Sequence, residues 1–120
     1  MIAKDIIKAI DASPLAIWNE HLLNKDYKSA FASDLMSDAL ALIQNSPDST
    51  VLITGLCNAQ VLRTAEMLDV EMIIFVRNKR LSKEDLEIAK EMGFNIFTTK
   101  HTMFKACGIL YEKGLNSIYE

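Results

Sequence analysis

Three short apolar segments give the chain its pattern, and each runs into a polar turn followed by a helical pattern. They are residues 51–54, 72–76 and 95–98, which begin roughly 20 residues apart, as compact strand–helix units do. Right-handed crossovers between such units make their strands parallel. Residues 72–76 are apolar without alternation, which is typical of a central strand covered by helices on both faces. The pattern therefore predicts a three-layer α/β fold with a mainly parallel sheet flanked by helices.

Capping residues mark the ends of the expected helices. Ser33 or Asp34 is expected to cap a helix that reaches about residue 44. The apolar stripe of this helix has the spacing i, i+4, i+7, i+8: Leu35, Ala39, Leu42 and Ile43. Asn58, Ser82 and Thr102 are placed to begin three later helices, which end near Leu68, Gly93 and Gly114.

The first third of the chain has a weaker pattern. A helix is expected over residues 2–12, ended by Ser13 and Pro14. Strands are expected at residues 15–18 and 27–31, with a turn at 24–26, and a loop at 45–49. Because no linker or repeat divides the sequence, residues 1–120 are expected to form a single domain.

Composition and charge exclude several classes of protein. Half of the residues are apolar and the formal net charge is -3, which argues against general binding to nucleic acid. No apolar run approaches the roughly 18 residues of a membrane span, and charges interrupt the first ten residues too early for a signal peptide. Cys57 and Cys107 lack CxxC spacing and cannot by themselves hold zinc or an iron–sulfur cluster. We expect a cytoplasmic protein with two reduced thiols, no metal, no cofactor and no membrane contact.

The carboxyl ends of the three strands are where a ligand of a parallel sheet would bind. The three turns there contain basic and polar residues but no carboxylate, although the chain is acidic overall. With helix N-termini adding partial positive charge, this edge is predicted to bind a small anion. The candidate ligand-binding residues are Thr54, Gly55, Asn58, Gln60, Arg77, Lys79, Thr99, His101 and Thr102.

Simpler roles remain open for the same residues. Asn58, Ser82 and Thr102 are equally explained as helix caps, and residues 77–80 as a solvated turn or a subunit contact. No GxxxxGK[ST], GxGxxG or GxSxG motif is present, so no catalytic residues are assigned. Cys57 and His101 lie on the same predicted edge, but no third residue is in place to orient the histidine.

A family resemblance covers about residues 32–115. It is carried by the run SDLMSDALA, the segment VLITGLCNAQ, the apolar strand before the turn at 77–80, and the helix start with Thr and Phe in the run KHTMFKACGILYEKGL. These features resemble the DRTGG domain family, although Thr54-Gly55-Leu56-Cys57-Asn58 stands where the naming motif would be. The family is similar to the N-terminal domain of HPr kinase/phosphorylase and also occurs beside CBS domains in regulated pyrophosphatases. Small stand-alone members are often labelled iron–sulfur-binding hydrogenase accessory proteins.

The resemblance implies a non-catalytic regulatory or assembly module that commonly pairs with another copy. We therefore expect a homodimer that binds a small anionic ligand, a nucleotide or phosphate, or a partner protein. Met36, Leu62 and Met67 lie off the main apolar stripes and look exposed from the sequence; an interface and the core are equally open for them. Two alternatives stay open: a small thiol-dependent enzyme using Cys57 and His101, and a structural accessory of a redox or hydrogenase complex.

Overall fold

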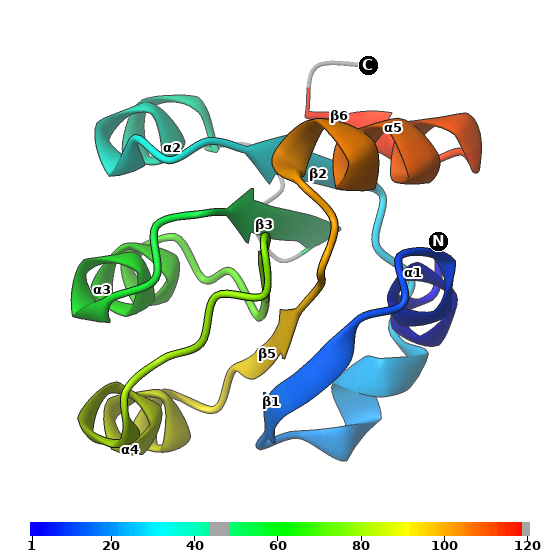
Figure 1. Ribbon diagram of the computed structural model, residues 1–120. Helices are drawn as coiled ribbons and strands as arrows, with labels where there is room; N and C mark the ends of the chain where they lie inside the picture. Colours follow the sequence, from blue (N-terminus) through cyan, green and yellow to red (C-terminus); the bar gives the residue numbers. More distant parts are fainter. Residues whose placement is uncertain (44–48, 119–120) are drawn as a thin grey trace.

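The protein forms an α/β fold around a twisted sheet, seen here in a computed structural model that describes residues 1–43 and 49–118. Within those residues the sheet has six strands in the order β1-β5-β4-β3-β2-β6 (Figure 1). The strands are β1 (Ser13–Ile17), β2 (Ser29–Ala32), β3 (Thr50–Thr54), β4 (Met72–Phe75), β5 (Asn95–Thr98) and β6 (Asn116–Ser117). All pairings are parallel except that of β1 with β5. The predicted mainly parallel sheet, with residues 72–76 inside it, is confirmed.

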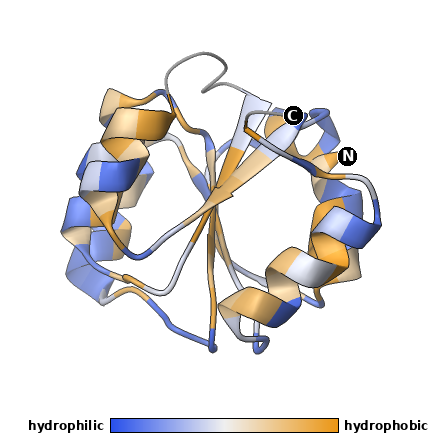
Figure 2. Cartoon of the chain, turned by 90° about the horizontal axis from the view of Figure 1, so that it is seen from above, coloured by the Kyte–Doolittle hydropathy of each residue, from blue (hydrophilic) through white to orange (hydrophobic). Residues whose placement is uncertain are grey.

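Helices cover both faces of the sheet and make it the middle of three layers (Figure 2). They are α1 (Ala3–Ala9), the 3-10 helix η1 (Glu20–Asn24), α2 (Met36–Leu42), α3 (Ala59–Met67), α4 (Lys83–Met92) and α5 (Met103–Glu112). One core lies between the sheet and α2, α3 and α4, and the other lies under α1 and α5. Alternate residues of β4 enter the two cores, Ile73 on the first side and Ile74 on the second. No helix in the described part of the chain is long and apolar enough to cross a membrane.

The strand–helix units at β3, β4 and β5 follow the sequence prediction closely. Asn58, Ser82 and Thr102 cap α3, α4 and α5, each accepting a backbone N–H three residues later. Gly93 ends α4 in the left-handed conformation, with φ 76°. The hydrogen bonds confirm these capping predictions. Caps can be predicted from the sequence because they depend on residues that are close along the chain.

The N-terminal third differs from its prediction. The first helix ends at Ala9, short of residue 12, and Asp11 turns the chain with φ 50°. The first strand begins two residues early and includes Pro14, which an edge strand tolerates. The second strand starts at Ser29 rather than 27, and residues 20–24 form η1, which the sequence analysis missed.

The start of α2 corrects another prediction. Neither Ser33 nor Asp34 caps the helix; its N-cap position is Leu35, which has no side-chain cap. The buried side of α2 is Met36, Ala39 and Ile43, whereas Leu35 and Leu42 are exposed. The expected end at residue 44 and most of the expected loop at 45–49 lie outside the described residues.

Of the three residues left open between an interface and the core, two are in the core. Leu62 is fully buried because α3 packs between α2 and α4, and Met36 of α2 is 2% exposed in the same core. Met67 is 72% exposed, as expected. A final short strand, β6, was also missed; it pairs in parallel with Ser29 and Ala30 of β2.

Candidate functional site

The carboxyl ends of β2, β3, β4 and β5 lie along one edge of the sheet, because these four strands are parallel. This carboxyl edge holds the nine candidate residues named from the sequence. Its centre is the turn after β3, where Thr54 and Gly55 are buried. The contacts of this turn define what the edge can bind.

The carboxylate of Asp34 accepts hydrogen bonds from the turn after β3. The Gly55 N–H donates to Asp34 Oδ1 at 2.6 Å, and the Thr54 hydroxyl donates to the same oxygen at 3.3 Å. Asp34 comes from the connection between β2 and α2, and β2 is the neighbour of β3 in the sheet. The turns after β3, β4 and β5 contain no carboxylate, as their sequence shows, but the connection after β2 brings Asp34 to the same edge. Asp34, with Ser33 as the alternative, was expected to cap a helix and was not considered as part of this edge.

Arg77 reaches the same glycine from the other neighbouring strand. A Cβ atom at position 55 would lie 2.9 Å from Arg77 Nη2 and 3.1 Å from Asp34 Oδ1. Any side chain there would have to displace the guanidinium or the carboxylate. The missing side chain of Gly55 thus leaves room for a cationic and an anionic group beside the same residue.

The turn after β4 is held in an uncommon conformation. Arg77 and Asn78 both have φ 56°, in the left-handed region that L-residues rarely adopt. The Arg77 N–H donates to His101 O at 2.9 Å, and the Asn78 N–H donates to Thr99 O at 2.8 Å. These bonds join the turns after β4 and β5, so the structure brings Arg77 and His101 together. They also fix the position of the Arg77 backbone, from which its side chain extends.

Several candidate side chains already have partners within the fold. Thr99 is buried, and its hydroxyl donates to Ile10 O at 2.6 Å. The Asn58 and Thr102 side chains act as helix caps. Gln60 is exposed in the first turn of α3, and Lys79 is exposed beside Arg77. The residues gathered around Gly55 are therefore fewer than the sequence analysis proposed: Asp34, Thr54 and Arg77 contact or flank it.

Cys57 lies on this edge as a protonated thiol at neutral pH. Burial raises the pKa of Cys57 to about 11; the positive charge of Lys79 opposes the shift and the negative charge of Asp85 adds to it. A thiol with a raised pKa is a poor nucleophile. Within residues 1–43 and 49–118, no three His, Cys, Asp or Glu side chains come together as metal ligands.

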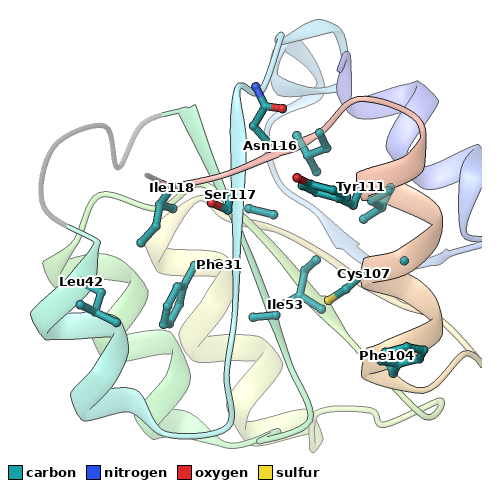
Figure 3. A pocket seen from close by; sticks show the side chains of 14 residues that line it. Phe31, Leu42, Ile53, Phe104, Cys107, Tyr111, Asn116, Ser117 and Ile118 are labelled. Carbon is teal, nitrogen blue, oxygen red and sulfur yellow. The ribbon is translucent and has the colours of Figure 1, made fainter. Parts of the chain in front are cut away.

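A second concave site lies at the side of the sheet, and the sequence analysis missed it. It is an apolar hollow of about 510 Å³ at the β2–β6 edge (Figure 3). Its lining includes Ile53 and Cys107 in its interior and Phe31, Leu42, Phe104 and Tyr111 around it. Burial raises the pKa of the Cys107 thiol there. The sequence does contain a pattern that points to this surface: the spacing of Phe104, Gly108 and Tyr111 places these three residues on one face of α5.

Comparison with known proteins identifies the fold but no family. No protein-family model matches the chain, and no curated protein matches its sequence. A solved structure matches over 98% of the chain with a TM-score of 0.70 and 21% identity. It is the crystal structure of the CBS and DRTGG domains of the regulatory region of Clostridium perfringens pyrophosphatase, complexed with the activator diadenosine tetraphosphate. The match spans 51% of that chain, so this protein has the α/β fold of about half of that regulatory region. This agrees with the DRTGG-like fold implied by the sequence resemblance.

Proposed function

We propose that this protein is a non-catalytic regulatory module that binds a small anion, a nucleotide or phosphate, at the carboxyl edge. One observation supports this most strongly. The Gly55 N–H holds a carboxylate oxygen of Asp34, and the Arg77 guanidinium lies at the same glycine. A backbone N–H and a guanidinium are the groups that bind phosphate oxygens well.

We further propose a binding mode that follows from these contacts. A phosphate oxygen would replace Asp34 Oδ1 at the Gly55 N–H, and Arg77 would pair with the phosphate. Lys79 and Lys100 are exposed in the adjoining turns and add positive charge. Because Asp34 begins the connection into α2, its release on binding would alter that connection. This is how ligand binding could be passed to a partner.

The matched structure favours a nucleotide among the possible anions. The pyrophosphatase regulatory region was solved with diadenosine tetraphosphate, which is called its activator. In that protein the fold belongs to a regulatory region. For this chain, a nucleotide ligand is carried over as part of the proposal. The raised pKa of Cys57 speaks against the alternative of a thiol-dependent enzyme.

Titration calorimetry with inorganic phosphate, ATP and diadenosine tetraphosphate tests the proposal. Replacing Arg77 with Ala should cost about 1.5–3 kcal/mol of binding free energy, the usual contribution of a charge-assisted hydrogen bond. Arg63→Ala is the matched control, since Arg63 is exposed in the middle of α3 and carries the same charge. Thermal melts beside each titration separate lost binding from lost folding. If the wild type binds none of these anions, or if Arg77→Ala binds them equally well, the proposed site is wrong.

We also propose that the module works as a homodimer, as the family resemblance implies. Light scattering at high micromolar concentration measures this directly. A strictly monomeric mass would remove the proposal, and it would leave the anion site untouched because all its described contacts lie within one chain.

A further inference from the structure

Helix α5 has two apolar sides, although it covers only one surface of the sheet. Its inner side is buried in the core through Ala106 and Leu110. A second set, Phe104, Gly108 and Tyr111, follows the spacing i, i+4, i+7 and faces outward. Phe104 is 89% exposed and Tyr111 is 60% exposed. An amphipathic helix of a monomer would carry polar residues there.

The outer side of α5 adjoins the hollow at the β2–β6 edge. In Figure 3, Phe31 and Leu42 lie on one side of strand β2, and Cys107, Phe104 and Tyr111 lie on the other. The hollow therefore reaches around strand β2 from one helical layer to the other. Within the described residues, β6 pairs with Ser29 and Ala30 only, so the outer edge of β2 beyond Ala30 adjoins no strand.

The projecting ring of Phe104 and the hollow lie next to each other on this surface. Phe104 projects almost fully, and a Cβ atom at Gly108 would meet nothing within 4 Å, so the helix has a notch one turn away from the ring. We call the surface made by Phe31, Leu42, Phe104, Gly108 and Tyr111 the α5–β2 face. It contains both a projecting ring and a recess, the two features that a twofold contact between copies would bring together.

The exposed area suits such an association. At about 200 Å² for a whole aromatic residue, Phe104 and Tyr111 together expose roughly 300 Å². A standard interface buries about 800 Å² on each partner, so two rings supply more than a third of it. The rim of the hollow, including the partly exposed Leu42, adds to this area. A patch of this size is comparable to the largest apolar patch on many soluble proteins, and such patches often have a function.

We infer that a second copy of this chain docks on the α5–β2 face, with Phe104 of each copy in the hollow of the other. The inference rests on the proposed homodimer and adds its surface. Aromatic rings in the centre of an interface are the residues that contribute most to binding. The apolar hollow then has a defined occupant, the ring of Phe104 from the partner copy.

The test compares the full-length chain with Phe104→Asp and a matched control, Met67→Asp. Both residues are exposed apolar residues on helices, and Met67 is on α3, which packs on the opposite face of the sheet. Sedimentation equilibrium or light scattering over a concentration series gives the dimer dissociation constant. Phe104→Asp should weaken the dimer at least about thirtyfold, as expected for a central aromatic residue. Met67→Asp should leave the constant within about twofold, and circular dichroism should show both variants folded.

The two thiols provide a second readout within one molecule. Cys107 lines the hollow, whereas Cys57 lies beside the other core. Dimerisation should slow the labelling of Cys107 by N-ethylmaleimide relative to its rate in Phe104→Asp, and the rate of Cys57 should stay the same. Mass spectrometry of the labelled peptides gives both rates.

The failures are distinct. A monomeric wild type overturns both the homodimer and its surface, and an apolar small molecule retained in native mass spectrometry would then identify the occupant of the hollow. A dimer that Phe104→Asp leaves as tight as the wild type keeps the homodimer but overturns this surface. Equal labelling of Cys107 in dimer and variant also overturns it. None of these outcomes bears on anion binding at Gly55.

Discussion

The carboxyl edge and the α5–β2 face differ in how far contacts within the chain cover their side chains and backbone groups. At the carboxyl edge, the chain supplies partners for its own polar groups: Asp34 for the Gly55 N–H, and His101 O for the Arg77 N–H. At the α5–β2 face, Phe104 and Tyr111 project from the surface at 89% and 60% exposure. A polar group needs one well-placed atom, which a neighbouring loop can provide. An apolar ring needs hundreds of square ångströms of cover, which a small domain has already used in its core.

This difference explains why the two sites call for different experiments. The proposed anion would have to compete with an existing contact at the carboxyl edge, so its affinity would depend on Asp34. The proposed docking on the α5–β2 face would cover exposed apolar area and would depend on the concentration of the chain. The following variants test each side of the comparison, beginning with the sheet on which both sites depend.

Replacing Ile74 with Asp should prevent folding and abolish both sites. Ile74 is fully buried in β4, between β3 and β5, and a carboxylate there would have no charged partner. The loss should exceed the roughly 4–5 kcal/mol that marks an exceptional substitution. Ile74→Val, as the control, should cost about 0.5–1.5 kcal/mol. Circular dichroism and thermal melts decide, and a cooperatively folded Ile74→Asp protein would contradict the position of β4 inside the sheet.

Asp34→Ala should weaken folding and strengthen anion binding. It removes the acceptor of the Gly55 N–H, which should cost about 1 kcal/mol of stability since Asp34 is exposed. It also frees that N–H and removes a negative charge beside Arg77, so phosphate should bind more tightly. Asp38→Ala, in the first turn of α2, is the control for loss of one carboxylate. Unchanged phosphate affinity in Asp34→Ala, measured by calorimetry, would show that Asp34 does not compete for the site.

Gly108→Ala should stabilise the isolated chain by roughly 0.5–1 kcal/mol, because glycine is costly in the middle of a helix. The added methyl group meets nothing within 4 Å. If the notch at Gly108 receives a partner side chain, the same variant should weaken the dimer. At low concentration, where the chain is monomeric, the variant should still melt at a higher temperature than the wild type. Parallel melts and light scattering measure the two effects. A variant that gains stability and also dimerises more tightly would show that the notch is not used.

The last prediction concerns pH and the thiol of Cys57. Its pKa is raised by burial from the ordinary 9.0 to about 11, so the unfolded chain loses this proton first as pH rises. Stability should therefore be unaffected by this group below pH 9 and should decrease between about pH 9 and 11. The rate of Cys57 alkylation should rise over the same upper range rather than near pH 8. A reaction rate that levels off by pH 9 would show that the thiol is more exposed than the fold implies.

Local sequence predicted the parts of the fold that depend on local contacts. Asn58, Ser82 and Thr102 bond to backbone groups three residues away, so their roles could be recognised from spacing alone. The burial of residues 72–76 was equally visible, since a strand with both faces covered is apolar throughout.

Contacts between distant segments could not be predicted in the same way. Asp34 and Gly55 lie 21 residues apart and meet because β2 and β3 are neighbours, which the pattern of either strand does not encode. Strand β6 has two residues, too few for any periodicity. Leu62 looked exposed on a single-helix stripe, but α3 has helices on both sides and buries a wider face. Binding of a ligand at the nine candidate residues stays a prediction.

The left-handed conformation of Arg77 sets a limit on engineering this protein for stability. An L-residue with a side chain is roughly 1–2 kcal/mol less stable than glycine at such an angle, so Arg77→Gly would relieve backbone strain. That exchange would also remove the guanidinium from Gly55. A screen that selects only for heat resistance would therefore favour variants that lack the guanidinium on which the proposed anion binding depends. Stability and anion recognition oppose each other at this one position, and a useful screen would have to select for both.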